Sequence, residues 1–243
     1  MSRIVIITGA SSGLGLSLAK RFTELGDEVL GISRTKIHWP ETKKQLRGKK
    51  NFSLIQLDVT SEQAVKQLLN RIYKAKKRVD ILINNAGYAA RSVSTEKLTL
   101  SEFNKNIEHN LISTFLMCKY TIPIFQRQGK GLMINISSMA GKRAVPRLVA
   151  YSVSKFGVVA LTQAIAKENE GSGWKCFTVC PGGMNTEMRA KLFGRADARR
   201  QQSSNFVADI IMKVVDGKIR VSSGGDIVIR HGKVTAINAL PPA

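Results

Sequence analysis

A tyrosine and a lysine stand four residues apart in the stretch AYSVSKFG, as Tyr151 and Lys155. At this spacing two side chains lie on one face of a helix, one turn apart. A free phenol has a pKa of about 10, and a nearby cation favours its phenolate form. A phenol held in this way can give a proton to a carbonyl oxygen or take one from an alcohol. Taken alone, the same pair is also what an exposed helix with a solvated lysine would carry.

A glycine-rich stretch, TGASSGLG at residues 8–15, follows an apolar run and opens a helical pattern. Glycines let the backbone turn sharply and approach a phosphate closely, and a helix N-terminus offers free N–H groups. This context favours a dinucleotide site, although Gly9, Gly13 and Gly15 are spaced more widely than in the ordinary fingerprint. A plain turn between a strand and a helix is the alternative.

The stretch GISRT, at the end of the second apolar run, bears on which dinucleotide is bound. NAD sites usually carry an acidic residue about 20 positions after the glycines, whereas an arginine suits the 2′-phosphate of NADP. Here Ser33 and Arg34 occupy that region, without a carboxylate. A guanidinium can bind a phosphate through two parallel hydrogen bonds. We therefore expect NADP(H) rather than NAD(H), with Arg34 as one of many surface cations as the alternative.

Short runs rich in β-branched residues alternate with longer helical patterns along the chain. Most of the short runs are apolar at both odd and even positions, as in parallel strands that are covered on both faces. Strands are predicted at residues 3–8, 28–33, 52–57, 80–84, 131–137, 175–180 and 226–230. Helices are predicted near residues 13–25, 61–75, 101–127, 150–170 and 204–215, the third opened by a capping box from Thr99 to Glu102. The pattern predicts a doubly wound α/β fold of Rossmann type, with a seven-stranded parallel sheet, helices on both faces and ligands at the carboxyl ends of the strands.

Several short motifs occur in the order that is typical of short-chain dehydrogenases/reductases, a family that the chain resembles over nearly its whole length. They are the Thr8–Gly15 turn, Asp58-Val59, NNAG at 84–87, Asn110, ISSMAG at 136–141, Tyr151-x-x-x-Lys155 and PGGMNT at 181–186. The resemblance implies an NADP(H)-dependent oxidoreductase that transfers hydride between a nicotinamide and a carbonyl or secondary alcohol. Ser138 lies thirteen residues before Tyr151, the family's usual interval, so we expect Ser138 rather than Ser137 to be the catalytic serine.

The resemblance also implies the role of each catalytic residue. Tyr151 would be the general acid/base, and Ser138 would hydrogen-bond the substrate oxygen. Lys155 would bind the nicotinamide ribose, and Asn110 would hold a water that connects Lys155 to solvent. The four residues together imply turnover, because a protein that only senses a cofactor needs no proton relay.

The cofactor contacts implied by the resemblance are more numerous. They are Gly9, Ser11, Ser12, Gly13, Leu14, Gly15, Arg34, Asp58, Val59, Asn85, Ala86, Gly87, Tyr151, Lys155, Pro181, Gly182, Met184 and Thr186. Asp58 and Val59 resemble the adenine-binding pair, and Thr186 resembles the residue that holds the carboxamide. For Asp58 and Asn85, capping of a strand end is an alternative that is compatible with cofactor binding.

The chain is strongly basic, with 38 Lys and Arg against 17 Asp and Glu, or +21. Such a charge attracts nucleic acid, anionic membranes or acidic substrates, but no recognition motif or interleaved aromatic residues accompany it. We therefore expect no specific nucleic-acid binding. Within Lys142–Arg147 three of six residues are basic, and within Arg189–Arg200 five of twelve. In this family these stretches close the substrate pocket, which suggests an anionic or thioester-linked carbonyl substrate; ordinary solvated loops are the alternative.

The length of 243 residues predicts one domain over residues 1–243, with a variable substrate segment at about 187–205 and a loop that includes residues 43–50. No run approaches the roughly 18 consecutive apolar residues of a membrane span. Three cysteines in apolar context and three scattered histidines predict neither a disulfide framework nor a metal site, so we expect a cytoplasmic protein without membrane attachment. Members of the family usually form homodimers or homotetramers through the helices at 101–127 and 150–170.

Two non-catalytic hypotheses stay open: a dinucleotide-binding sensor or scaffold, and a nucleic-acid binder with a basic surface. The C-terminal segment from Val221 is also unusual, because it lacks the Gly-Gly pair that often follows the last strand in the 3-oxoacyl thioester reductases of the family. His231-Gly232 stands there instead. This departure weakens the transfer of a specific substrate and puts the C-terminal part of the pocket and the subunit interface in doubt.

Overall fold

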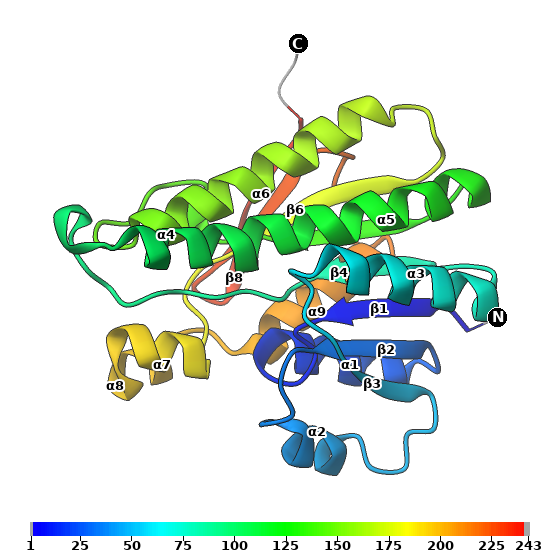
Figure 1. Cartoon of the computed structure of the whole chain (residues 1–243), viewed down its shortest axis with the longest axis horizontal. Coiled ribbons are helices and arrows are strands. Elements are labelled where there is room, and N and C mark those ends of the chain that lie inside the picture. Colours follow the sequence, from blue (N-terminus) through cyan, green and yellow to red (C-terminus); the bar gives the residue numbers. More distant parts are fainter. Residues whose placement is uncertain (1, 241–243) are drawn as a thin grey trace.

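Eight strands form one sheet in the computed structural model, which describes residues 2–240 (Figure 1). Seven of them are parallel, in the order β3-β2-β1-β4-β5-β6-β7, and β8 is antiparallel at the edge. The strands are β1 (Ile4–Thr8), β2 (Glu28–Ser33), β3 (Phe52–Gln56), β4 (Ile81–Asn84), β5 (Leu132–Ile136), β6 (Lys175–Pro181), β7 (Asp226–Arg230) and β8 (Lys233–Asn238). The order reverses between β1 and β4, and in open α/β sheets this switch point is where ligands bind.

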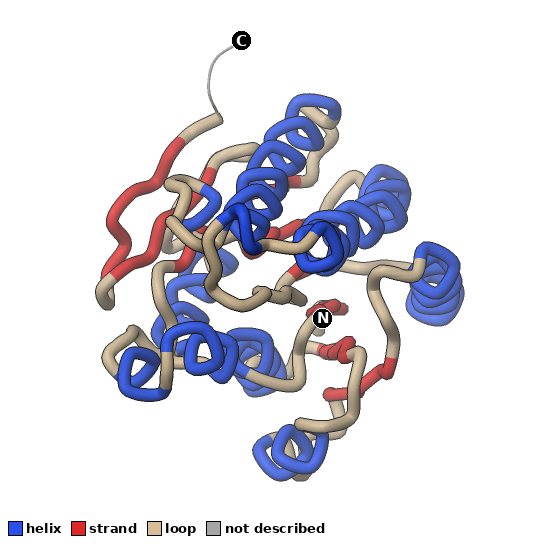
Figure 2. The backbone as a smooth tube through the Cα atoms, turned by 60° about the vertical axis from the view of Figure 1, so that its left-hand side comes forward, coloured by secondary structure: helices blue, strands red, loops and turns tan. Residues whose placement is uncertain are grey.

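Helices cover both faces of the sheet (Figure 2). Helices α1 and α9 pack on one face, and α3, α5 and α6 pack on the other. The helices are α1 (Gly13–Glu24), α2 (Trp39–Gln45), α3 (Glu62–Lys76), α4 (Leu100–Asn106), α5 (Ser113–Gln128), α6 (Val149–Glu168), α7 (Glu187–Phe193), α8 (Arg195–Arg199) and α9 (Ser204–Val215). The two-sided cover confirms the predicted Rossmann-type arrangement.

Each central strand contributes to both cores because its side chains alternate between the faces. In β1, Val5 and Ile7 join the core under α1 and α9, whereas Ile4 and Ile6 join the core under α3, α5 and α6. This alternation explains why the strands are apolar on both parities.

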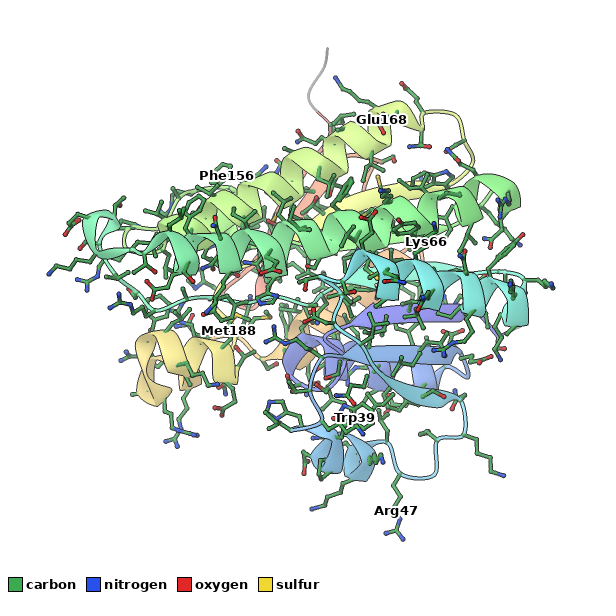
Figure 3. All side chains as sticks on the ribbon, viewed as in Figure 1. Trp39, Arg47, Lys66, Phe156, Glu168 and Met188 are labelled. Carbon is green, nitrogen blue, oxygen red and sulfur yellow. The ribbon has the colours of Figure 1, made fainter. Side chains whose placement is uncertain are left out.

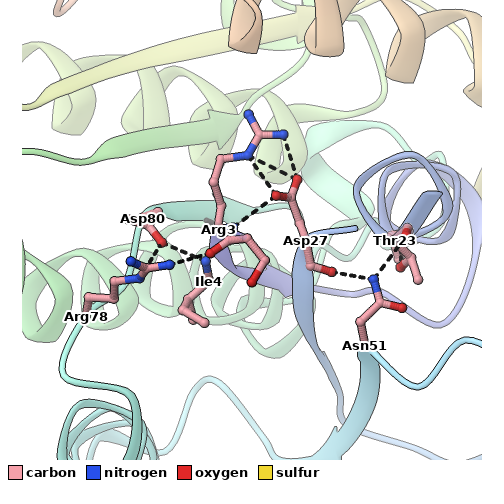
Figure 4. A network of polar contacts seen from close by, with 9 residues as sticks. Arg3, Ile4, Thr23, Asp27, Asn51, Arg78 and Asp80 are labelled. Atoms are coloured by element: carbon pink, nitrogen blue, oxygen red, sulfur yellow. Dashed lines mark hydrogen bonds and ion pairs between the residues drawn. The ribbon is translucent and has the colours of Figure 1, made fainter. Parts of the chain in front are cut away.

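The amino ends of the strands are held by a polar network far from the glycine turn (Figure 4). Asp27, just before β2, accepts hydrogen bonds from the Arg3 guanidinium, with a shortest N···O distance of 2.6 Å. Asp80, just before β4, accepts a hydrogen bond of 2.7 Å from the backbone N–H of Ile4. The side chains of Asp27 and Asp80 thus stabilise the sheet at the amino ends of its strands. The opposite ends of the strands, their carboxyl ends, stay free for a site.

The helix predicted at residues 101–127 forms with an irregular turn in its middle. Thr99 caps α4 through the predicted capping box, because its hydroxyl accepts from the Glu102 N–H and the Glu102 carboxylate accepts from the Thr99 N–H. A π-helical turn, Ile107–Ile112, then links α4 to α5. Such turns inside helices occur frequently at functional sites. This one carries Asn110.

The prediction of a seven-stranded, wholly parallel sheet is wrong at its C-terminal edge. His231 and Gly232 both have positive φ, of 50° and 68°. Positive φ at both central residues is what a tight type I′ hairpin turn requires, and Asn-Gly or Asp-Gly is its usual sequence signal. His-Gly is not such a signal, so the returning strand β8 was not predicted. The unusual C-terminal segment is thus a hairpin that extends the sheet.

Two further segments contain helices that were not predicted. The prediction of a loop at residues 43–50 is wrong for the first three of these residues, which form the end of α2. Pro40 is compatible with this helix because it lies in the first turn. The variable segment at 187–205 holds α7 and α8, separated by Gly194. Both segments lie on the same side of the molecule as α1 in Figure 1.

By length and composition, α6 is the one helix within residues 2–240 that could cross a membrane, and half of its apolar window is buried in the fold. All three cysteines are buried and free. No group of three or more His, Cys, Asp or Glu side chains that could hold a metal ion lies in the described part of the chain.

Candidate functional site

Two adjoining cavities open at the carboxyl ends of the strands. The larger, of about 570 Å³, lies between the glycine turn, Tyr151 and Lys155 of α6, and helices α7 and α8. The smaller, of about 180 Å³, lies between the ends of β2 and β3 and is lined by Arg34 and Asp58. Gly9, Ala86 and Gly87 line both. The two cavities therefore form one continuous groove across the switch point of the sheet.

The glycine turn requires glycine at specific positions. Gly9 and Gly13 adopt positive φ, of 66° and 52°. A Cβ on Gly15 would lie only 2.2 Å from the carbonyl oxygen of Gly9. The turn is thus tight enough to bring its backbone and the N-terminus of α1 to the wall of the groove.

The motif after β4 braces this turn. The Thr8 hydroxyl accepts hydrogen bonds of 2.9 Å from the backbone N–H groups of Asn85 and Ala86. The Asn85 side-chain amide donates to the carbonyl oxygen of Thr8 at 3.0 Å and to that of Gly9 at 3.3 Å. Because Asn85 also lines the larger cavity, it both braces the turn and forms part of the groove wall.

Tyr151 and Lys155 lie together on α6, as their spacing predicts. The Lys155 Nζ atom is 5.8 Å from the centroid of the Tyr151 ring and donates a hydrogen bond of 2.9 Å to the carbonyl oxygen of Ile136. Lys155 is only 4% exposed. This burial lowers the pKa of its ammonium to about 8, against an ordinary value of 10.5.

The expectation that Lys155 lowers the pKa of Tyr151 is wrong for this structure. Burial raises the pKa of the Tyr151 phenol, and a hydrogen bond with Ser138 offsets only part of that rise. The Lys155 ammonium faces the carbonyl of Ile136 instead of the phenol oxygen. Tyr151 is therefore a protonated phenol at neutral pH, which suits it to give a proton.

The two candidate serines have different partners. Ser138 is close enough to Tyr151 to oppose the rise in the pKa of the phenol, and its hydroxyl accepts a hydrogen bond of 3.1 Å from the Ala140 N–H. Ser137 instead donates to the backbone carbonyl of Lys155 at 2.8 Å. Ser137 lines the larger cavity, whereas Ser138 is the serine whose hydroxyl affects the phenol of Tyr151.

Asn110 lies behind the groove on the π-helical turn, and its side chain is fully buried. Its amide donates to the Tyr88 carbonyl at 2.8 Å and to the Ser154 hydroxyl at 2.9 Å, while its Oδ1 accepts from the Tyr88 N–H at 2.7 Å. A Cβ on Gly87 would lie 3.2 Å from Oδ1 of Asn110 and 3.6 Å from Nζ of Lys155. Because Gly87 has no side chain, a space remains beside it, and the amide oxygen of Asn110 and the ammonium of Lys155 both face this space.

The smaller cavity combines an arginine, a carboxylate and a histidine. Arg34 Nη1 lies 3.0 Å from Nε2 of His109. Asp58 caps the strand end, since its Oδ1 accepts from the N–H of Thr60 at 3.0 Å and from its hydroxyl at 2.8 Å. Burial raises the pKa of Asp58, but the Thr60 hydrogen bonds and the nearby Arg34 and His109 outweigh it, so the net pKa lies below its ordinary value.

The other predicted cofactor residues divide into two groups. Ser12, Gly13, Leu14, Met184 and Thr186 line the larger cavity, and Val59 lines the smaller one. Ser11, Gly15, Pro181 and Gly182 lie behind the wall: the Ser11 hydroxyl is 2.9 Å from that of Ser33, and the Gly182 N–H donates to Ile229 at 2.8 Å. These four line neither cavity.

Several residues of the groove were not predicted from the sequence. They are Tyr88 and His109 in the smaller cavity, and Lys20 and Gln45 in the larger one. Helical periodicity offered a signal for Lys20, which is seven residues after Gly13 and so on the same face of α1. The chain order offered no such signal for Gln45, whose helix meets the groove only through the fold.

Of the basic rim residues expected from the sequence, only some face the groove. Lys142 is engaged with the buried Asp226 at 2.7 Å, and Arg189 with Asp197 at 2.5 Å. Arg195 and Arg199 do line the larger cavity. Besides Lys155, the cations that line the larger cavity are thus Lys20, Arg195 and Arg199, and none comes from the loop after β5. Arg195 lies 3.7 Å from the carboxylate of Glu187, which lines the same cavity.

The fold and the glycine turn define a dinucleotide-binding protein of Rossmann type. Within that class, the chain belongs to the short-chain dehydrogenase family, whose family model matches residues 3–197. The chain is 31% identical to 2-(R)-hydroxypropyl-CoM dehydrogenase of Xanthobacter autotrophicus, over 98% of this chain and 100% of that protein. It is 26% identical to NADPH-dependent pterin aldehyde reductase of Arabidopsis thaliana, over 94% and 93%.

A solved structure, ElxO with NADP bound, superposes with a TM-score of 0.86 at 28% identity, covering 94% of this chain and 97% of that one. These relatives and the family model show that the protein is an oxidoreductase that uses a nicotinamide cofactor.

Proposed function

We propose that this protein is an NADP(H)-dependent carbonyl reductase or alcohol dehydrogenase in which Tyr151 is the general acid/base. One observation carries the proposal: Tyr151 and the buried Lys155 line the groove together, with Lys155 Nζ 5.8 Å from the Tyr151 ring, and Ser138 is close enough to Tyr151 to oppose the rise in the pKa of the phenol. A solvated tyrosine and lysine would show neither the serine partner nor the buried ammonium.

The groove fits a nicotinamide dinucleotide. Its central part is formed by the N-terminus of α1 and by the glycine turn, whose Gly9 and Gly13 line the cavity without side chains, so backbone and ligand can approach closely. When bound, the nicotinamide supplies or accepts the hydride. Lys155 would hold the adjoining ribose, and Arg34 would hold the phosphate that distinguishes NADP(H).

In the reductive direction, Tyr151 gives its proton to the carbonyl oxygen of the substrate while Ser138 holds that oxygen by a hydrogen bond. Because burial raises the pKa of Tyr151, the phenol is protonated when the substrate arrives. Lys155, whose pKa is lowered to about 8, can exchange protons near neutral pH and so restore the phenol. Asn110 Oδ1 has one remaining lone pair, which suits it to hold a water beside Lys155.

The preference for NADP(H) over NAD(H) rests on Arg34 at the smaller cavity. The end of β2 carries Arg34 and no carboxylate. Asp58, which also lines the cavity, already accepts hydrogen bonds from the N–H and the hydroxyl of Thr60. The named cofactor of the pterin aldehyde reductase and the NADP bound to ElxO agree with this preference.

The substrate that we propose is an anionic or thioester-linked carbonyl compound or its alcohol. Lys20, Arg195 and Arg199 line the larger cavity, so its mouth attracts anions. The relative named for 2-(R)-hydroxypropyl-CoM is named for a secondary alcohol carried on a larger group.

The assay that tests this function follows absorbance at about 340 nm with NADPH and, separately, NADH, against neutral carbonyls and their anionic or thioester-linked counterparts. Arg199→Gln should weaken kcat/KM for the anionic set more than for the neutral set. Arg200→Gln is the matched control, because Arg200 is exposed and lies outside the cavity lining. Equal turnover of the two sets, without salt dependence, would show that the substrate is neutral. No turnover with retained cofactor binding would favour the sensor hypothesis.

We further propose that the chain is one catalytic domain that acts as a homodimer or homotetramer in the cytoplasm. Ile112, Phe115, Val153 and Phe156 are 40–45% exposed. They lie on the π-helical turn, α5 and α6, which run side by side, and Figure 3 shows Phe156 on the outer side of α6. Exposed apolar side chains on neighbouring helices fit a second copy of the chain.

The net charge of +21 is tested separately with nucleic acid. Binding that disappears at physiological salt would show that the protein binds nucleic acid only non-specifically, through its positive charge.

A further inference from the structure

The imidazole of His109 lies directly against the guanidinium of Arg34. Arg34 Nη1 is 3.0 Å from Nε2 of His109 and 3.5 Å from its Nδ1. A guanidinium can only donate hydrogen bonds, so His109 accepts here and is neutral. Both residues line the smaller cavity. The arginine that we assign to the phosphate is thus held by a group that can itself become a cation.

His109 is surrounded by charged groups from four parts of the fold. They are Arg34 after β2, Asp58 after β3, Lys105 of α4, and Glu108 beside it on the π-helical turn. Tyr88, after β4, stacks edge-on against the imidazole at 5.7 Å. Burial and then Arg34 lower the pKa of His109, while Glu108 and Asp58 raise it, and the net pKa lies below its ordinary value.

We propose that His109 is a second residue that recognises the 2′-phosphate of NADP(H), and that it takes up a proton from solvent when this phosphate binds. This inference rests on the proposed preference for NADP(H). A phosphate monoester carries nearly two negative charges above about pH 6. When this phosphate is bound, Arg34 donates its hydrogen bonds to the phosphate and no longer to His109. The imidazole of His109 then lies beside the phosphate anion as well as the Arg34 cation, and the anion favours its protonated form.

The proposal predicts how the affinity for each cofactor changes with pH. Binding of NADPH is coupled to uptake of one proton at His109, so the Kd for NADPH rises with pH between the pKa of His109 in the free protein and its higher pKa in the complex. The slope for one proton is at most about tenfold per pH unit. NADH has no 2′-phosphate, so its binding lacks this dependence.

Titration of the 243-residue chain with NADPH and with NADH, followed by cofactor fluorescence from about pH 6 to about pH 8, tests the coupling in the range where histidine titrates. His109→Gln keeps a hydrogen-bonding side chain but cannot be protonated, and it leaves the titration of the phosphate itself unchanged. The increase in the Kd for NADPH across this range should be at least about threefold larger in the wild type than in His109→Gln. His38→Gln, at an exposed histidine that lines neither cavity, is the matched control and should behave as the wild type.

Proton NMR of the imidazole C–H groups gives an independent readout. NADP⁺ should raise the pKa of His109 by at least about one unit, and NAD⁺ should leave it unchanged, with His38 and His231 as internal references. If NADPH and NADH bind equally at every pH, the proposed cofactor preference itself is wrong. If NADPH is preferred but its pH profile is the same in His109→Gln, and the pKa of His109 does not move, this inference is overturned while the preference stands.

Discussion

The ammonium of Lys142 lies 2.7 Å from the buried carboxylate of Asp226, and this pair ties the turn after β5 to the first residue of β7. The second oxygen of Asp226 accepts a hydrogen bond of 2.8 Å from Asn238 at the end of β8. The C-terminal hairpin is therefore anchored to the short turn that begins at Ser138. Lys142 supports the site from behind, although its position in the chain suggested a cation facing the substrate.

Lys142→Met should destabilise the protein by about 2 kcal/mol, because it leaves a buried carboxylate without its cation. Urea unfolding measures the loss. Arg143→Met is the control, since Arg143 is exposed, and it should change stability by less than about 0.5 kcal/mol. Equal stability of the two variants would show that the pair contributes nothing to stability.

Tyr151→Phe should reduce kcat by about 10²- to 10⁴-fold, the range for loss of a general acid. The Kd for NADPH should change little, because the substitution removes only the hydroxyl. Tyr120→Phe removes a phenol that hydrogen-bonds Glu62 on the surface, and its kcat should equal that of the wild type. Retained activity in Tyr151→Phe would refute the proposed mechanism.

The buried ammonium of Lys155 predicts a pH dependence of stability. Its pKa is about 8 in the folded protein against 10.5 ordinarily, so between these values the unfolded chain binds one more proton than the folded chain. The free energy of unfolding therefore gains, from this residue, up to about 1.4 kcal/mol per pH unit as the pH rises through that window.

Urea unfolding of wild type and Lys155→Met at about pH 7, 8 and 9 isolates this contribution. The difference between the two proteins should move in favour of the wild type above about pH 8. The buried thiols have raised pKa values and act in the opposite sense above their ordinary pKa, but they are common to both proteins and cancel. A difference that is constant with pH would mean that Lys155 titrates normally.

Arg34→Asp should lower the ratio of kcat/KM for NADPH to that for NADH by about 10- to 100-fold, because it removes charge-assisted hydrogen bonds and adds repulsion at the phosphate. Arg47→Asp makes the same change of charge at a side chain that points away from the fold in Figure 3. An unchanged ratio in Arg34→Asp, or an equal shift in both variants, would show that Arg34 does not bind the phosphate directly.

The double substitution Phe115→Ser and Phe156→Ser should convert the proposed oligomer to monomers, since it removes two apolar side chains that a second copy would cover. Light scattering coupled to size-exclusion chromatography measures the mass. Ile37→Ser is the control, because Ile37 is 76% exposed but lies before α2, far along the chain from both helices. A monomeric wild type would refute the proposed assembly.

Prediction from the sequence was most successful where a local pattern has one physical meaning. The strand-turn-helix at Thr8–Gly15 and the helical spacing of Tyr151 and Lys155 were both located correctly, because glycine spacing and helix periodicity act over a few residues. The hairpin at His231-Gly232 was missed because a histidine with positive φ leaves no sequence signal of the kind that Asn-Gly provides.

The amino-acid sequence by itself determined the Rossmann class, the positions of the first seven strands along the chain, the family and most of the residues that meet at the carboxyl ends of the strands. Only the tertiary structure decided how those residues interact. Lys142 is drawn to Asp226, Lys155 to the Ile136 carbonyl and His109 to Arg34, over separations of 84, 19 and 75 positions. Partners so distant are brought together by packing, which leaves buried groups such as Asp226 and Lys155 to be paired, and no local pattern records that choice.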